Sequence, residues 1–144
     1  MSQLPPALPP EQPSHPHQHS LQPVLINGTT QDDRTMGMLI HLLSLLTGII
    51  GVLILWLVKR ESSRFVDHHG KESLNFQISL LIYSIAIFLV TFVFSIITLG
   101  IGVFVMIPLY LLLVVGVFVL EIMALVAATK GEWYRIPMTI RFIR

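Results

Sequence analysis

The stretch FVDHHGKESLNFQ at residues 65–77 carries Asp67, two adjacent histidines and Glu72 within six residues. Side chains of these types bind metal ions or exchange protons. Adjacent histidines on a helix, however, point about 100° apart, and the i, i+4 histidine pair of a zinc helix is missing here. The spacing therefore favours the polar entrance of a helix, capped by Asp67 or a neighbour, and predicts neither a metal nor a cofactor.

Glu121 is the second candidate for chemistry, because it is the only charged residue between Asn75 and Ala128. A carboxylate inside an apolar span costs several kcal/mol unless it is protonated or paired, so such acids are functional candidates. Eight residues separate Glu121 from Thr129, and eight separate Tyr83 from Asn75. At ~1.5 Å per residue, both side chains lie about 12 Å from the same end of their helices. The sequence predicts a hydrogen bond between Glu121 and Tyr83. An ion or proton pathway and an unpaired acid near the interface remain alternatives.

His41 lies a few residues inside the first apolar run. If that run crosses a membrane once, His41 lies near the opposite face from Glu121, and an ion pair between them is not expected. We therefore interpret His41 as a packed, hydrogen-bonding histidine. A first run that turned back would bring it toward Glu121.

The composition indicates the environment in which these residues lie. The chain is 53% hydrophobic and 12% charged, with a mean hydropathy of +0.76, which is typical of a membrane protein. A net charge of +1 gives no support for a nucleic-acid partner. The absence of cysteine excludes disulfides and thiolate chemistry.

Three apolar runs, at about residues 36–58, 75–98 and 103–128, predict an all-α bundle of about three transmembrane helices. A run of about 22 residues spans roughly 33 Å, enough to cross a hydrocarbon core of ~30 Å. We place the second break at residues 98–102 or a little later, so that Pro108 can lie in the first turn of the third helix. Gly48 and Gly51 leave open a first run that forms a hairpin, giving four helices.

The basic residues predict the orientation. They gather in a connector at residues 59–74 and in a tail at residues 129–144, so both segments are expected on the cytoplasmic side. Three spans then place the N-terminus outside. Residues 1–35 hold seven of the nine prolines and are rich in Gln and His, which predicts a disordered tail.

The connector and the tail return to the same side and could form one amphipathic docking surface for lipid headgroups or a partner. Anchoring of helix ends is an equally good reading of the same residues. The candidates for the surface are Arg64, His68, Lys71, Asn75, Lys130, Trp133 and Arg135.

The ordered pair HGKESLNFQIS and KGEWYRIP, at residues 69–79 and 130–137, resembles a family of small bacterial membrane proteins. The family is grouped with the magnetosome proteins MamF and MmsF and, more remotely, with a membrane subunit of the chloroplast Tic import translocon. The resemblance covers roughly residues 36–143 and implies little about activity, since most members have none assigned.

These observations predict a non-enzymatic interaction or assembly protein of the bacterial cytoplasmic membrane. Its expected partners are the lipid bilayer and another membrane protein or a second copy of itself. The alternative is a transport component, either a translocon-like subunit or a small ion or proton pathway that uses Glu121.

Overall fold

The computed structural model describes residues 26–144 as four helices and an extended C-terminal segment. The helices are α1 (Gln31–Thr47), α2 (Ile49–Lys59), α3 (Arg64–Ile97) and α4 (Ile101–Thr129), so the predicted all-α class is confirmed. Only α3 and α4 are both long and apolar enough to cross a membrane, within the part of the chain that the structure describes. The count of such helices is two and not three. Most of the predicted disordered tail lies outside the described residues, and its last five residues belong to α1.

The first apolar run breaks at Gly48, whose φ of 62° lies in the left-handed region that glycine adopts without a steric penalty. Helices α1 and α2 fold back on each other across this residue. At ~1.5 Å per residue they are about 26 and 17 Å long, shorter than the ~30 Å hydrocarbon core. A single span over residues 36–58 is therefore wrong, and the hairpin alternative is the one that the structure has.

Helices α3 and α4 form the second hairpin. Its turn lies at residues 98–100, where Leu99 and Gly100 have φ values of 52° and 90°, inside the predicted break. Pro108 lies in the interior of α4 and not in its first turn, because α4 already begins at Ile101. The predicted polar connector is also shorter than expected. Only residues 60–63 separate α2 from α3, and residues 64–74 belong to α3.

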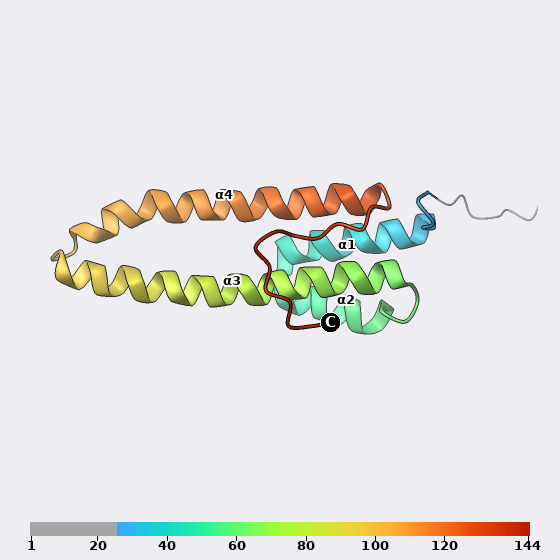
Figure 1. Ribbon diagram of the computed structural model, residues 1–144, viewed down its shortest axis with the longest axis horizontal. Coiled ribbons are helices and arrows are strands. Elements are labelled where there is room, and N and C mark those ends of the chain that lie inside the picture. The colour runs from blue at the N-terminus through green and yellow to red at the C-terminus, as the bar shows by residue number, and fades with distance from the viewer. Residues whose placement is uncertain (1–25) are drawn as a thin grey trace, which may run out of the picture.

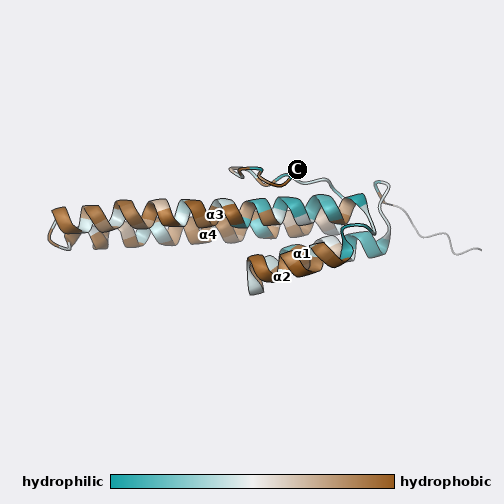
Figure 2. Cartoon of the chain, turned by 90° about the horizontal axis from the view of Figure 1, so that it is seen from below, coloured by the Kyte–Doolittle hydropathy of each residue, from teal (hydrophilic) through white to brown (hydrophobic). Residues whose placement is uncertain are grey.

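The two hairpins overlap at one end of the molecule (Figure 1). We call this end, formed by α1, α2, residues 64–79 of α3 and residues 120–129 of α4, the bundle end. The rest of α3 and α4, residues 80–119, is the hairpin end, and hydrophilic residues gather away from it (Figure 2). Glycines permit the close packing of the bundle end. A Cβ at Gly37 of α1 would lie 2.9 Å from Phe65, and one at Gly70 of α3 would overlap Trp56 of α2.

Residues 130–144 form no helix. They run along α3 as an extended segment, which we call the strap, and the C-terminus lies beside the bundle end (Figure 1). The sequence predicted a basic segment lying on the membrane surface. The strap instead packs on the protein, and Ile136 is 1% exposed.

Candidate functional site

A buried polar network joins three helices at the bundle end. Glu121 of α4 and His41 of α1 are 1% and 0% exposed, and Glu121 Oε2 lies 3.0 Å from His41 Nδ1. The other carboxylate oxygen accepts a hydrogen bond of 2.6 Å from the Ser44 hydroxyl. Gln77 of α3 donates to the same hydroxyl and to the Ser44 carbonyl. Both oxygens of the buried carboxyl group therefore have partners.

His69 of α3 extends this network toward the end of the molecule. Its Nδ1 lies 3.0 Å from His41 Nε2, and its Nε2 lies 3.1 Å from the backbone carbonyl of Glu132 in the strap. The His69 ring is fully buried and packs against Phe65, with ring centroids 4.4 Å apart. Glu121, His41, His69 and the Glu132 carbonyl thus form one continuous chain of polar contacts.

The predicted pair of Glu121 and Tyr83 is wrong. Tyr83 donates to the backbone carbonyl of Met138 at 3.0 Å, whereas Glu121 faces His41 and Ser44. The error came from the first apolar run, because its turn at Gly48 brings His41 into the bundle beside α4.

The structure does not support a metal site at the opening motif. Among residues 26–144, no three His, Cys, Asp or Glu side chains are grouped to hold a metal ion. Asp67 accepts from the Trp56 indole at 2.9 Å and pairs with Lys71 at 2.6 Å. The two histidines are engaged too, because His68 Nε2 contacts the Tyr134 carbonyl at 2.9 Å, as His69 contacts Glu132.

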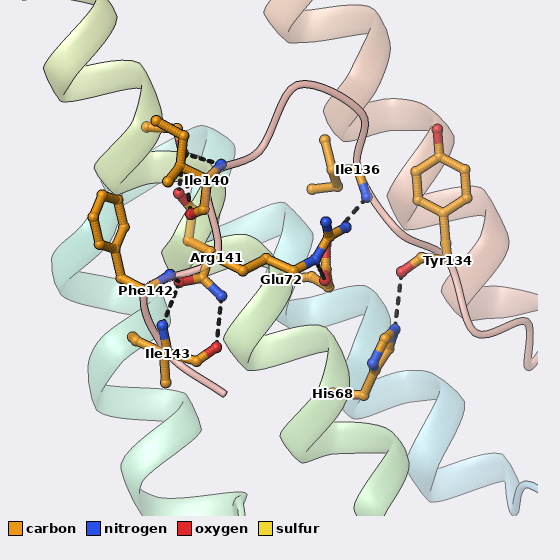
Figure 3. Close-up of polar contacts among 10 residues, drawn as sticks. His68, Glu72, Tyr134, Ile136, Ile140, Arg141, Phe142 and Ile143 are labelled. Atoms are coloured by element: carbon orange, nitrogen blue, oxygen red, sulfur yellow. Dashed lines mark hydrogen bonds and ion pairs between the residues drawn. The ribbon is translucent and has the colours of Figure 1, made fainter.

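A second polar feature is a stripe along α3 that holds the strap. Its members are four, three, four and four residues apart, which places them on one helix face, and they are His68, Glu72, Asn75, Ser79 and Tyr83. Each of them contacts the strap backbone (Figure 3 labels the first two and their strap partners). The stripe therefore supplies hydrogen bonds to a segment that has no helix of its own.

Asn75 and Glu72 make the densest contacts of this stripe. The Asn75 amide accepts from the N–H groups of Phe142 and Ile143 and donates to the Ile143 carbonyl, all within 2.9 Å. Glu72 accepts from the Ile136 N–H and from the Arg141 guanidinium, the latter at 2.8 Å. The hydrogen bond to Glu72 raises the pKa of Arg141 above its ordinary value, so this guanidinium stays charged.

The predicted docking surface divides into two sets. His68 and Asn75 hold the strap, and Lys71 pairs with Asp67, so these three are engaged within the protein. The exposed members of the predicted surface, all at the bundle end, are Arg64, Lys130, Trp133 and Arg135. Trp133 is 53% exposed, but its ring is fixed from one side by Phe65 and His68, at centroid distances of 5.5 and 5.3 Å.

The hairpin end offers different chemistry. A groove of about 520 Å³ lies between α3 and α4, and its polar lining consists of Ser84, Thr91 and Tyr110. No Asp, Glu, Lys, Arg or His occurs between residues 80 and 119. The groove therefore has no charged side chain or histidine, and Tyr110 is the one titratable group in its lining.

Sequence reasoning missed several residues that now matter. Ser44 and Gln77 both contact the buried network, and neither is among the candidates that the sequence suggested. Glu72, which the sequence offered only as part of the opening motif, is buried and holds the strap. The four-three spacing of polar residues along α3 was the available signal, because a polar stripe on an otherwise apolar helix requires a polar partner.

Together, the fold and its buried network define a small all-α protein with the apolar surface of a membrane protein. A comparison with protein-family models then identifies it further. The chain belongs to the magnetosome magnetite crystal formation protein family, MamF/MmsF, whose model matches residues 32–143. Comparisons with curated proteins and with solved structures find no match. The remote likeness to a Tic subunit stays a prediction.

Proposed function

We propose that this protein is a non-enzymatic integral membrane protein that docks an acidic surface of a partner protein at its bundle end. The observation that carries the proposal is the contrast in exposed surface. Exposed basic side chains of residues 26–144 occur only at the bundle end, where α1 and α2 also expose apolar side chains, whereas the hairpin end has no charged residue and exposes mostly apolar ones. Lipid can cover the apolar surface, and the basic surface is left for a partner.

The packing of the two hairpins supports a topology for this proposal. The Asn27 side chain donates to the Lys130 carbonyl at 3.1 Å, so the start of α1 and the end of α4 lie together. We propose that α3 and α4 cross the membrane and that α1 and α2 enter it as a re-entrant hairpin. Both ends of the described chain then lie on the cytoplasmic side, where basic residues concentrate. The predicted outside N-terminus depended on a straight first span and is not retained.

Arg64, Trp133 and Arg135 are the side chains best suited to contact the partner. Tryptophan and arginine are the residue types that dominate binding energy at protein interfaces. Because Phe65 and His68 already hold the Trp133 ring, less side-chain entropy is lost when a partner packs on it. For a family named for magnetite crystal formation, we propose that docking at this surface recruits or positions a further protein of that process.

A photo-crosslinker placed at Arg135 in native membranes tests the docking. We expect a protein adduct that is lost in the double variant Arg64→Glu, Trp133→Ala and retained in the control Arg144→Glu. An adduct that contains only lipid, or one that survives the double variant, would contradict docking. Equal membrane insertion of all variants must be shown by alkaline extraction, so that a loss of adduct reports binding.

A transport component remains the second candidate, because a buried carboxyl group linked to two histidines is suited to carry protons. Liposome flux measurements on the wild type and on Glu121→Gln distinguish the two. Flux that depends on Glu121 would favour transport over docking. We rank transport second because only three polar side chains line the groove at the hairpin end. A conducting path needs more polar side chains than that.

A further inference from the structure

The direction of the hydrogen bonds in the buried network follows from its last member. A backbone carbonyl can only accept, so His69 Nε2 must carry the proton in its contact with the Glu132 carbonyl. The contacts between His69 and His41 and between His41 and Glu121 are each 3.0 Å. Each is short enough for a hydrogen bond and so must hold one proton.

Three contacts therefore hold three protons, which leaves Glu121, His41 and His69 together without net charge. The proton between Glu121 and His41 can lie on either partner. In one state a carboxylic acid faces a neutral imidazole, and in the other a carboxylate faces an imidazolium. Neither state adds net charge to an interior where an isolated charge is costly. The geometry itself thus keeps one shared proton at this position.

We propose that Glu121, His41 and His69 form a proton-binding relay that holds this shared proton and exchanges it with water at the bundle end. The relay goes beyond the docking function, and neither depends on the other. Each histidine has one ring nitrogen on the side of Glu121 and one on the side of the strap. Imidazole can accept a proton at one nitrogen while it releases another from the second.

Release of a proton proceeds in three transfers. The Glu121 carboxyl group gives its proton to His41 Nδ1, His41 Nε2 gives its proton to His69 Nδ1, and His69 Nε2 gives its proton to water. One O–H and two N–H bonds break, and two N–H bonds and one O–H bond of hydronium form. Both imidazoles end neutral in their other tautomer, and Glu121 keeps the electron pair as a carboxylate. Uptake is the reverse.

The strap closes the outer end of this relay. The Glu132 carbonyl accepts the hydrogen bond of His69 Nε2, so water can bond to this nitrogen only when the strap moves away from it. The Trp133 ring packs on Phe65, which itself covers the His69 ring. Strap opening therefore gates the exchange.

Few other titratable groups face the relay. His68 of α3 lies beside His69, with ring centroids 5.4 Å apart, and its Nε2 is bonded to Tyr134 and not to His41. From α1 and α3, the neutral side chains Ser44 and Gln77 close the network behind Glu121. The only titratable residue of α2 is Lys59, at its last position. The relay can thus exchange protons only at its His69 end, when the strap moves away, and it is closed toward the hairpin end.

The first test measures the histidine tautomers in the full chain, labelled with ¹⁵N-histidine and placed in lipid bilayers. Solid-state NMR should show a proton on Nε2 of His69 and a hydrogen-bond coupling between the His41 and His69 rings. The variant His41→Gln assigns the signals. A His69 ring without a proton on Nε2, or without coupling to His41, overturns the proposal.

The second test measures exchange of the His41 ring protons with D₂O. In His69→Gln the amide can still donate to the Glu132 carbonyl, but it cannot accept one proton while it releases another. We expect exchange at least about tenfold slower than in the wild type. The control is Ser84→Ala at the hairpin end, which leaves the relay and the strap contacts intact and should exchange within about twofold of the wild type.

Equal exchange in His69→Gln and the wild type overturns the relay, as does equal slowing in both variants. If His69→Gln loses helix content, its exchange rate is not used, and the NMR measurement of the histidine tautomers in the wild type decides whether the relay exists. A failure of the relay leaves the docking function intact, because the crosslinking test uses residues outside this network.

Discussion

The bundle end and the hairpin end use the same two helices in opposite ways. Over residues 65–79, α3 is mostly buried, and its polar side chains contact α1, α2 and the strap. Over residues 80–97 the same helix is mostly exposed and apolar. The comparison teaches that burial in this protein follows the polar residues, because lipid can solvate apolar side chains but cannot satisfy polar ones.

The strap shows the same principle for the backbone. An extended segment packed on the protein has N–H and C=O groups without helical partners, and such groups are costly when they are buried without hydrogen bonds. The stripe on α3 supplies those partners, so the strap and the polar half of α3 depend on each other. The hairpin end needs no stripe, since its helices satisfy their own backbone groups.

Replacement of Glu121, in the buried network of the bundle end, should cause the largest loss of unfolding free energy. Glu121→Lys places an uncompensated cation beside His41 and should cost about 3–5 kcal/mol of unfolding free energy. Glu121→Gln keeps an oxygen for Ser44 and a donor for His41, and should cost about 1 kcal/mol. Unfolding in mixed micelles, followed by circular dichroism, measures both. Equal losses would show that the network is not paired as described.

Removal of Asn75 should release part of the strap. Asn75→Ala loses three hydrogen bonds to strap backbone groups, at about 1 kcal/mol each. We expect an unfolding free energy lower by about 3 kcal/mol and faster tryptic cleavage after Arg141. The control is Ser84→Ala at the hairpin end, where cleavage should keep the wild-type rate. Unchanged cleavage in Asn75→Ala would show that the strap does not depend on the stripe.

Two glycines give a comparison with the smallest expected effect. A Cβ at Gly70 would overlap the Trp56 side chain, whereas one at Gly116 would meet nothing within 4 Å. Gly70→Ala should therefore lower the unfolding free energy by about 2 kcal/mol through overpacking. Gly116→Ala should raise it by up to about 1 kcal/mol through helix propensity. Chemical unfolding of both variants measures the difference, and two effects of the same sign would contradict the assigned packing.

Part of this fold could be predicted from the sequence. The apolar runs indicated helices, the glycine-containing segment at residues 98–102 indicated the second turn, and the cost of burying a carboxylate singled out Glu121. Hydropathy also allowed a first run that turns back at Gly48. Hydropathy could not distinguish one span from a hairpin, because the same apolar residues can contact lipid in both arrangements.

The partner of Glu121 could not be predicted for the same reason. His41 lies 80 residues away, and only the turn at Gly48 brings it to α4. The strap was missed because basic and aromatic residues near a helix end are equally typical of a membrane-surface segment. Apart from the pair of Arg141 and Glu72, its hydrogen bonds with α3 involve strap backbone groups, which carry no signal in the sequence of the strap.

The most direct test of the proposed topology is the position of three residues relative to the membrane. The chain has no cysteine, so single cysteines at Asn27, Leu99 and Arg144 can be labelled with a membrane-impermeant maleimide in intact cells and after permeabilisation. The account predicts that positions 27 and 144 behave alike and are labelled only after permeabilisation, whereas position 99, at the tip of the α3–α4 hairpin, is labelled in intact cells. Labelling of position 27 together with position 99 in intact cells would contradict the account, because it would place the start of α1 on the same side as the hairpin tip.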